Sequence, residues 1–175
     1  MNEIIEKAPQ LPADVEWHFI GTLQSNKVKP LLRGVPGLAY VESVSSAKVA
    51  SLLDKHWAQE HPGTRLNVLV QINTSGEDNK DGVEAAEAPA LVAHVIDACP
   101  NLAFRGLMTI GRPGDVSCFD ALAQLRDKLA SELGGLPAEL ELSMGMSADY
   151  AEAVRRGATS VRIGSSLFGA RPPKT

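Results

Sequence analysis

The chain has 175 residues, enough for one folded unit with a substantial hydrophobic core. A formal net charge of −4 without any basic run argues against nucleic acid and anionic membrane surfaces as partners. An aromatic content of only 5% argues against a base-stacking platform. No apolar stretch approaches the ~20 residues that a membrane-spanning helix needs.

Two further features predict a cytoplasmic protein. Residues 1–16 are acidic and polar, and they lack the positive start and apolar middle of a secretory signal peptide. The chain has two cysteines, Cys99 and Cys118, and their spacing matches no metal site. Such isolated thiols are typical of a reducing compartment.

Apolar runs and helical periodicities alternate along the chain. It opens with what reads as the end of a helix at 2–8, which Pro9 and Pro12 close. The predicted strands are 17–21, 39–44, 66–72, 103–110, 142–146 and 160–163. The predicted helices are 28–32, about 47–59, about 84–98, about 117–133, and a last one that Ser147 caps and Gly157 ends.

This alternation predicts a parallel α/β fold. Residues 66–72 (LNVLVQI) are almost continuously apolar, as in a strand that helices cover on both faces of a sheet. Strands that alternate with helices through short loops imply parallel pairing and right-handed crossovers. The candidates are an open doubly wound sheet and a (β/α)8 barrel, and six units are two short of a barrel. No G-x-G-x-x-G follows the first strand, so a dinucleotide fold has little support.

The C-terminal strands deliver small residues to one edge of the predicted sheet. Ser147 follows the strand at 142–146, and Gly164 and Ser165 follow the strand at 160–163. A helix N-terminus beside a glycine turn favours a phosphate, because unpaired N–H groups and the helix dipole both attract an anion. Arg162 lies at the same strand end. The predicted helix between these strands presents Tyr150, Ala151 and Val154 as its apolar face.

Purely structural roles for these residues stay open. Ser147 can cap its helix, Gly164 can turn the chain, and Arg162 can pair with a neighbouring carboxylate. Together they indicate a phosphate site more strongly than any one of them does alone.

Several strings at the predicted strand ends resemble the pyridoxal phosphate homeostasis protein family, over about residues 3–171. They are HFIGTLQSNK (18–27), VES (41–43), QINTSGEDNKDGV (71–83), FRGLMTIG (104–111) and SMGMSADYAEAVRRGATSVRIGSSLFGAR (143–171). Members of this family are barrels similar to the N-terminal domain of alanine racemase. The resemblance implies that residues 1–175 form a single barrel domain that holds pyridoxal 5′-phosphate (PLP) in the cytoplasm, as a carrier or regulator rather than an enzyme.

Carried over by motif, Ser147, Gly164 and Ser165 bind the phosphate and Arg162 faces the pyridine nitrogen. His18 and Met144 line the pocket. Arginine does not give up its proton, so it keeps the ring nitrogen unprotonated and the ring a weak electron sink. For His18 the alternative is a strand histidine that a neighbouring residue satisfies.

The resemblance also implies a barrel truncated at its N-terminus to about six β/α units. Family members begin with two further units, the first of which ends in the lysine that bonds to the cofactor aldehyde. Lys27 and Lys80 lie in loops at the C-terminal side of their strands, where the chemistry of a barrel occurs, and are the candidates for a substitute anchor. The alternative, which the sequence favours, is that both are solvated loop lysines. Two missing strands leave the strands at 17–20 and 160–163 as open edges, which predicts self-association. The functional alternatives are a racemase-like PLP enzyme and a degenerate fragment that binds nothing.

Overall fold

A parallel sheet forms the centre of the computed structural model, which describes residues 1–77, 81–133, 136 and 139–170. The sheet has six strands in the order β1-β2-β3-β4-β5-β6, and every neighbouring pair is parallel. The strands are β1 (Trp17–Phe19), β2 (Leu38–Val44), β3 (Leu66–Gln71), β4 (Leu102–Met108), β5 (Glu141–Met146) and β6 (Ser160–Arg162).

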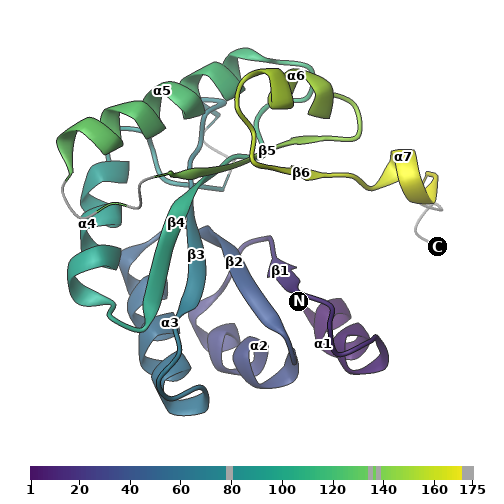
Figure 1. Cartoon of the computed structure of the whole chain (residues 1–175), viewed down its shortest axis with the longest axis vertical. Helices are drawn as coiled ribbons and strands as arrows, with labels where there is room; N and C mark the ends of the chain where they lie inside the picture. Colours follow the sequence, from purple (N-terminus) through teal and green to yellow (C-terminus); the bar gives the residue numbers. More distant parts are fainter. Residues whose placement is uncertain (78–80, 134–135, 137–138, 171–175) are drawn as a thin grey trace.

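Helices follow the strands in turn, as the sequence predicts. The α-helices are α1 (Asn2–Lys7), α2 (Val28–Gly34), α3 (Ala47–Glu60), α4 (Ala88–Ala98), α5 (Ser117–Glu132), α6 (Tyr150–Arg155) and α7 (Ser165–Phe168). Two short 3-10 helices, η1 (Ala8–Gln10) and η2 (Ser25–Lys27), lie between them in the chain. Helices α2 to α5 lie along one side of the sheet, while α7 stands apart at the C-terminal end (Figure 1).

The sheet is curled. The evidence is that its second and fifth strands, which are not neighbours, contact each other across the inside. The Ser143 hydroxyl of β5 donates to Glu42 Oε2 of β2 at 2.6 Å. The Tyr40 hydroxyl of β2 donates to Glu141 Oε1 of β5 at 3.0 Å. A flat sheet would hold these strands three positions apart, at roughly 4.8 Å per strand. The structure is therefore a curled half-barrel, which confirms the predicted α/β barrel-type fold.

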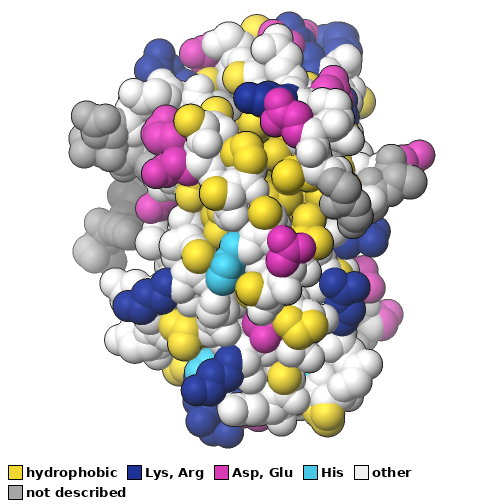
Figure 2. Space-filling model, turned by 90° about the vertical axis from the view of Figure 1, so that its left-hand side faces the viewer, with side chains coloured by type: hydrophobic (Ala, Val, Ile, Leu, Met, Phe, Trp, Pro, Cys, Tyr) yellow, Lys and Arg dark blue, Asp and Glu magenta, His cyan; other side chains and the backbone are white. Residues whose placement is uncertain are grey.

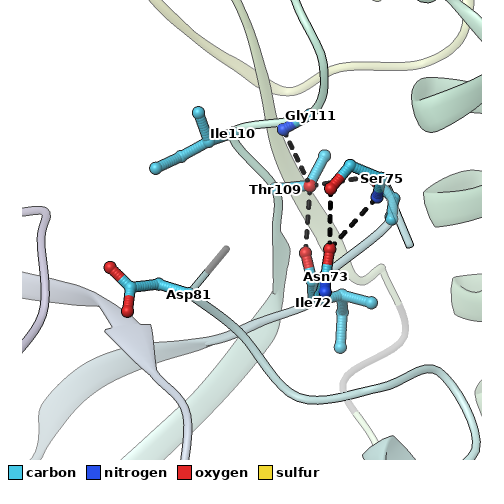
Figure 3. Close-up of a pocket in the computed structure, with 8 residues that line it drawn as sticks. Ile72, Asn73, Ser75, Asp81, Thr109, Ile110 and Gly111 are labelled. Carbon is cyan, nitrogen blue, oxygen red and sulfur yellow. Dashed lines mark hydrogen bonds between the residues drawn. The ribbon is translucent and has the colours of Figure 1, made fainter. Parts of the chain in front are cut away.

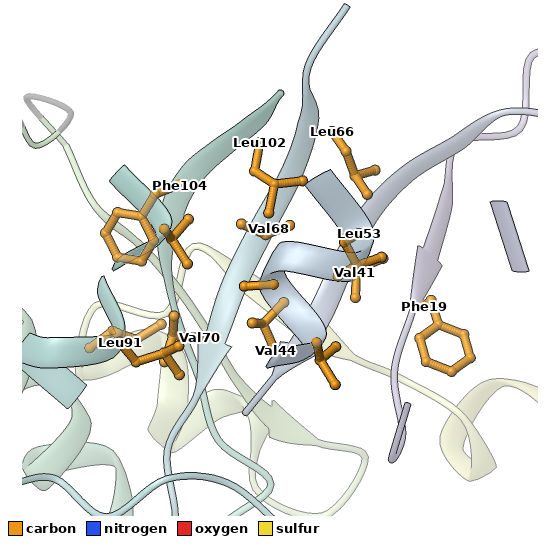
Figure 4. Packing of buried hydrophobic residues seen from close by; sticks show 14 of the residues in the cluster. Phe19, Val41, Val44, Leu53, Leu66, Val68, Val70, Leu91, Leu102 and Phe104 are labelled. Carbon is orange, nitrogen blue, oxygen red and sulfur yellow. The ribbon is translucent and has the colours of Figure 1, made fainter. Parts of the chain in front are cut away.

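The hydrophobic core lies between the sheet and its helices (Figure 4). Val68 and Val70 of β3 and Phe104 of β4 pack in one cluster with Leu53 of α3 and Leu91 of α4, all nearly or fully buried. The continuous apolar run at 66–72 is explained by this position: every residue of β3 except Asn67 is buried. Each of these large side chains stabilises the fold by about 1.5–3 kcal/mol relative to exposure.

Helix α4 begins one turn later than predicted. It starts at Ala88, and the predicted start at about 84 is wrong. Pro89 lies in the first turn, where its fixed φ suits a helix and its missing N–H has no partner to lose.

The predicted apolar face of α6 is also wrong. Tyr150 and Val154 are 44% and 54% exposed, and Ala153 is the residue that the helix buries. Gly145 of β5 explains this orientation, because a Cβ added there would lie 2.5 Å from the Ala153 Cβ. The glycine thus lets this face of the short helix approach the strand closely.

Strands β1 and β6 are the two edges of the sheet, as expected for a half-barrel. On the face shown in Figure 2, basic and acidic side chains are interspersed, in keeping with the net charge of −4. Among the described residues, no helix is both long and apolar enough to cross a membrane.

Candidate functional site

A cavity of about 690 Å³ opens where β5 and β6 end. Its volume is within the range of small-molecule sites. Apolar side chains that follow β1 and β4, together with one from α7, surround a polar end that the last two strands provide. The lining residues are Ile20, Ile110, Met146, Ser147, Ala148, Arg162, Ile163, Gly164, Ser165, Phe168 and Gly169. Four predicted site residues, Ser147, Arg162, Gly164 and Ser165, are thus brought together in one cavity.

Ser147 joins the two strand ends at the polar end of this cavity. Its hydroxyl oxygen accepts the backbone N–H groups of Gly164 at 3.0 Å and Ser166 at 3.3 Å. The Ser166 hydroxyl donates back to the Ser147 carbonyl at 3.3 Å. The prediction that Ser147 caps the following helix is wrong: α6 begins after Asp149, whose carboxylate accepts the Met146 N–H at 2.7 Å.

Gly164 leaves the turn after β6 open. A Cβ added there would meet no atom within 4 Å, and Gly164 precedes the first residue of α7. The Gly164 and Ser166 N–H groups are bonded to the Ser147 hydroxyl oxygen, while the hydroxyl groups of Ser147 and Ser165 line the cavity beside this open turn. Such groups bind phosphate oxygens well, since they are hydrogen-bond donors at a turn where no side chain blocks the approach.

Arg162 supplies the positive charge of the cavity. Its Nη1 donates to the Ser143 hydroxyl at 2.9 Å, and its Nη2 donates to the Thr109 carbonyl at 2.7 Å. Burial lowers the pKa of Arg162, and the carboxylates of Glu42 and Asp149 oppose that effect. The guanidinium remains charged, because an arginine side chain does not lose its proton in proteins. The two hydrogen bonds fix its plane and leave other N–H groups for a ligand.

His18 is connected to this site through Glu42 and lies outside the cavity. Its Nδ1 donates to Glu42 Oε1 at 2.6 Å, and its ring stacks on Tyr40 with centroids 4.3 Å apart. The hydrogen bond to Glu42 raises the pKa of His18. Burial by itself raises the pKa of Glu42, but the hydrogen bonds from His18 and Ser143 outweigh it and lower that pKa. His18 is thus satisfied by a neighbour, as the alternative interpretation proposes.

Met144 is fully buried in the hydrophobic core, and Met146, two residues later, lines the cavity instead. Successive residues of a regular strand point to opposite faces of the sheet. The register of β5 against β6 shifts between Ser143 and Met146, so this alternation does not continue to Met146. Ser143 has a partner on the inner face in Glu42, so the side chain of Met144 points toward the helices.

Sequence reasoning missed Glu42 and Ser143. Glu42 is 2% exposed, and Ser143 is fully buried. A signal for Glu42 was present: it is the one acidic residue within the otherwise apolar and small run at 39–44. A charged residue in a buried strand generally has a partner.

Lys27 does not lie at the cavity. It ends η2 and lines a separate hollow with residues that include Met1, Thr22 and Gln24. Lys80, the other candidate anchor, falls outside the described residues.

A second, smaller hollow of about 280 Å³ lies beside the first at the ends of β3 and β4, and Ile110 lines both (Figure 3). The Thr109 hydroxyl connects its walls: it donates to the Ile72 carbonyl at 3.0 Å and accepts the Gly111 N–H at 3.1 Å. Asn73 Oδ1 accepts from Ser75 at 2.9 Å. These bonds hold the loops that carry Thr109, and the carbonyl of Thr109 in turn holds Arg162.

Comparison with known proteins gives one consistent answer. The sequence profile of the alanine racemase N-terminal domain matches residues 7–172. The chain is 46% identical to the pyridoxal phosphate homeostasis protein of Bos taurus over 182 aligned positions, and 45% identical to that of Caenorhabditis elegans over 184. These alignments cover 98% and 99% of this chain but 66% and 75% of the two relatives. The chain therefore spans about two thirds to three quarters of their length.

Solved structures agree with this. PipY of Synechococcus elongatus PCC7942 superimposes with a TM-score of 0.83 at 31% identity, covering 96% of this chain and 78% of PipY. A second structure of PipY, with PLP bound, matches with a TM-score of 0.80 at 30% identity. Alanine racemase of Clostridium difficile matches with a TM-score of 0.69 at 14% identity, a likeness of fold alone. With its matched domain, its sequence identity and its half-barrel in agreement, the chain belongs to the pyridoxal phosphate homeostasis protein family.

Proposed function

We propose that this chain binds PLP in the 690 Å³ cavity and serves in its intracellular homeostasis, as a carrier or regulator of the cofactor. One observation carries the proposal: Ser147, Gly164, Ser165 and the Arg162 guanidinium line a single cavity. The relatives named for PLP homeostasis, and PipY with PLP bound, support PLP as the anionic ligand.

The residues fit the chemical groups of PLP. The phosphate suits the open turn at Gly164, where Ser147 and Ser165 add hydroxyls. The apolar side chains of Ile20 and Ile110 suit the flat faces of a pyridine ring. Arg162 suits the pyridine nitrogen, because the unprotonated nitrogen accepts a hydrogen bond and arginine can only donate one.

We infer a carrier rather than an enzyme from the same residues. Bound PLP supplies an aldehyde that reacts with amines and a ring that withdraws electrons. Arg162 would keep the ring nitrogen unprotonated, which weakens that withdrawal. In the described part of the chain no lysine lines the cavity, so these residues offer binding and orientation but no covalent anchor.

We also infer action in the cytoplasm. Cys99 and Cys118 are both buried free thiols. Unpaired cysteines of this kind are typical of a reducing compartment.

An absorbance titration of the purified chain with PLP tests the proposal. We expect saturable binding that Arg162→Met weakens about tenfold or more, since a charge-assisted hydrogen bond contributes ~1.5–3 kcal/mol. The matched control is Arg33→Met. Arg33 does not line the cavity, and its Nε lies 2.7 Å from Glu60 Oε1. Absence of binding, or equal loss in both variants, would overturn the proposal and favour a degenerate fragment.

Borohydride reduction followed by intact mass and peptide mapping locates any covalent attachment. We expect no stoichiometric adduct on Lys27, which lines another hollow. A single complete adduct on Lys27 would place the aldehyde there and contradict the assigned cavity.

A further inference from the structure

A hydrogen-bonded chain crosses the inside of the half-barrel from one edge strand to the other. It starts at His18 of β1, passes through Glu42 of β2 and Ser143 of β5, and ends at Arg162 of β6. Each link is short, at 2.6, 2.6 and 2.9 Å. The two carboxylate oxygens of Glu42 serve different partners, Oε1 toward His18 and Oε2 toward Ser143. Arg162, at its end, lines the candidate cofactor cavity.

We propose that Glu42 and Ser143 are positioning residues that couple the protonation of His18 to the affinity of the cavity for an anion. The inference rests on the proposed function, since it concerns the same cavity. Ser143 orients the guanidinium, because its hydroxyl accepts from Arg162 while donating to Glu42. Neither residue touches the cavity, so both act through Arg162.

The sign of the coupling follows from the charges. With His18 neutral, the negative charge of buried Glu42 offsets the positive charge that Arg162 presents to an anion. With His18 protonated, Glu42 is balanced by a nearer cation at 2.6 Å, and the field of Arg162 in the cavity is stronger. Anion affinity therefore rises as pH falls through the pKa of His18, which Glu42 raises above its ordinary value of 6.5.

Other charged groups face the members of this chain. Glu16 and Glu141 act on His18, as does the stacked ring of Tyr40. Glu3 and Lys7 of α1 line a hollow that His18 shares. Asp149 faces Arg162. Because all of these persist when His18 alone is replaced, a His18 variant separates its contribution from theirs.

The first test uses ligand-free protein. NMR titration between pH 5 and 9 follows the ring of His18 and the guanidinium signals of Arg162. We expect the Arg162 signals to shift with the midpoint of His18, and that midpoint to fall in Glu42→Gln. If the Arg162 signals of the wild-type protein do not shift as His18 is protonated, the proposal is overturned. This result needs no variant to fold.

The second test measures PLP affinity against pH by absorbance. The phosphate of PLP itself titrates near pH ~6, so His18→Asn, which keeps an N–H donor, is the reference. The ratio of the wild-type PLP affinity to that of His18→Asn should rise about tenfold from pH 9 to pH 6, which is a usual size for coupling between two sites. The control is His56→Asn, which should behave as wild type, because His56 hydrogen-bonds to Gln59 within α3.

Ser143→Ala separates positioning from charge, because it breaks the link without changing any ionisable group. We expect PLP affinity about tenfold lower, or ~1.4 kcal/mol, with the pH response lost. Unchanged affinity and pH response in Ser143→Ala would overturn the proposal. If PLP binds at no pH, the proposed function fails, while the ligand-free titration still decides whether the chain of residues couples His18 to Arg162.

Discussion

Gly106 is the position at which one added methyl group should damage the fold most. It lies in β4 at a register shift against β3, with φ of 158°. The backbone of Glu141 in β5 lies directly against it. A Cβ at Gly106 would be 2.0 Å from the Glu141 carbonyl oxygen and 2.6 Å from its nitrogen.

The cost of Gly106→Ala follows from this distance. Ordinary contacts of a Cβ begin at 3.4 Å, so 1.4 Å must be gained by moving the backbone of one strand relative to the other. Overpacking costs ~1–3 kcal/mol when side chains can adjust, and backbone adjusts less, so we expect a loss of about 3 kcal/mol. With a urea slope of ~2 kcal/mol per M, the unfolding midpoint should fall by about 1.5 M.

The same change should reach the cavity. The Thr109 N–H after β4 donates to the Ser143 carbonyl of β5 at 3.1 Å, and both residues hold Arg162. Separating β4 from β5 disturbs both contacts of the guanidinium. PLP affinity should therefore fall in Gly106→Ala even under conditions where the variant remains folded.

Urea unfolding followed by circular dichroism measures the loss. Gly114→Ala is the matched control: Gly114 has φ of 76° but would bring its Cβ within 4 Å of nothing. It should lose only the cost of a strained backbone, about 1 kcal/mol. If Gly106→Ala loses no more than Gly114→Ala, the close approach of β5 does not limit this position and the reasoning is refuted.

Three further predictions concern the cavity, the buried pair and the sheet edges. Gly164→Ala should leave the unfolding midpoint unchanged, since its Cβ meets no atom, but should weaken PLP binding about tenfold by narrowing the turn; equal binding would show that the phosphate lies elsewhere. Because the pKa of His18 is raised, His18 contributes stability that is fully present below pH 6.5 and is lost as pH rises. Because the pKa of Glu42 is lowered, Glu42 contributes stability that is present above pH 4.5 and is lost in acid. Thermal melts should therefore show the pair stabilising most between these values, and Glu42→Gln should flatten the decline from pH 6 to 9; parallel curves would contradict the pairing. Edge strands β1 and β6 should promote self-association, and a clean monomer across concentrations in analytical ultracentrifugation would count against this.

The sequence by itself determined the order and type of the elements. The apolar run at 66–72 and the periodic helices predicted parallel β/α units, because burial on both faces leaves a continuous apolar pattern. The sequence also predicted that Ser147, Gly164, Ser165 and Arg162 lie together at one edge of the sheet, since the carboxyl ends of neighbouring parallel strands meet there. Their contacts with PLP stay a prediction.

Only the tertiary structure decided which side chains these elements present to one another. The role of Ser147 depends on α7 approaching the end of β5, and the buried face of α6 depends on the space that Gly145 leaves. The pairing of Glu42 with Ser143 joins residues 101 positions apart on strands that are not neighbours. Local periodicity carries no information about such a contact, because it exists only once the whole sheet has curled.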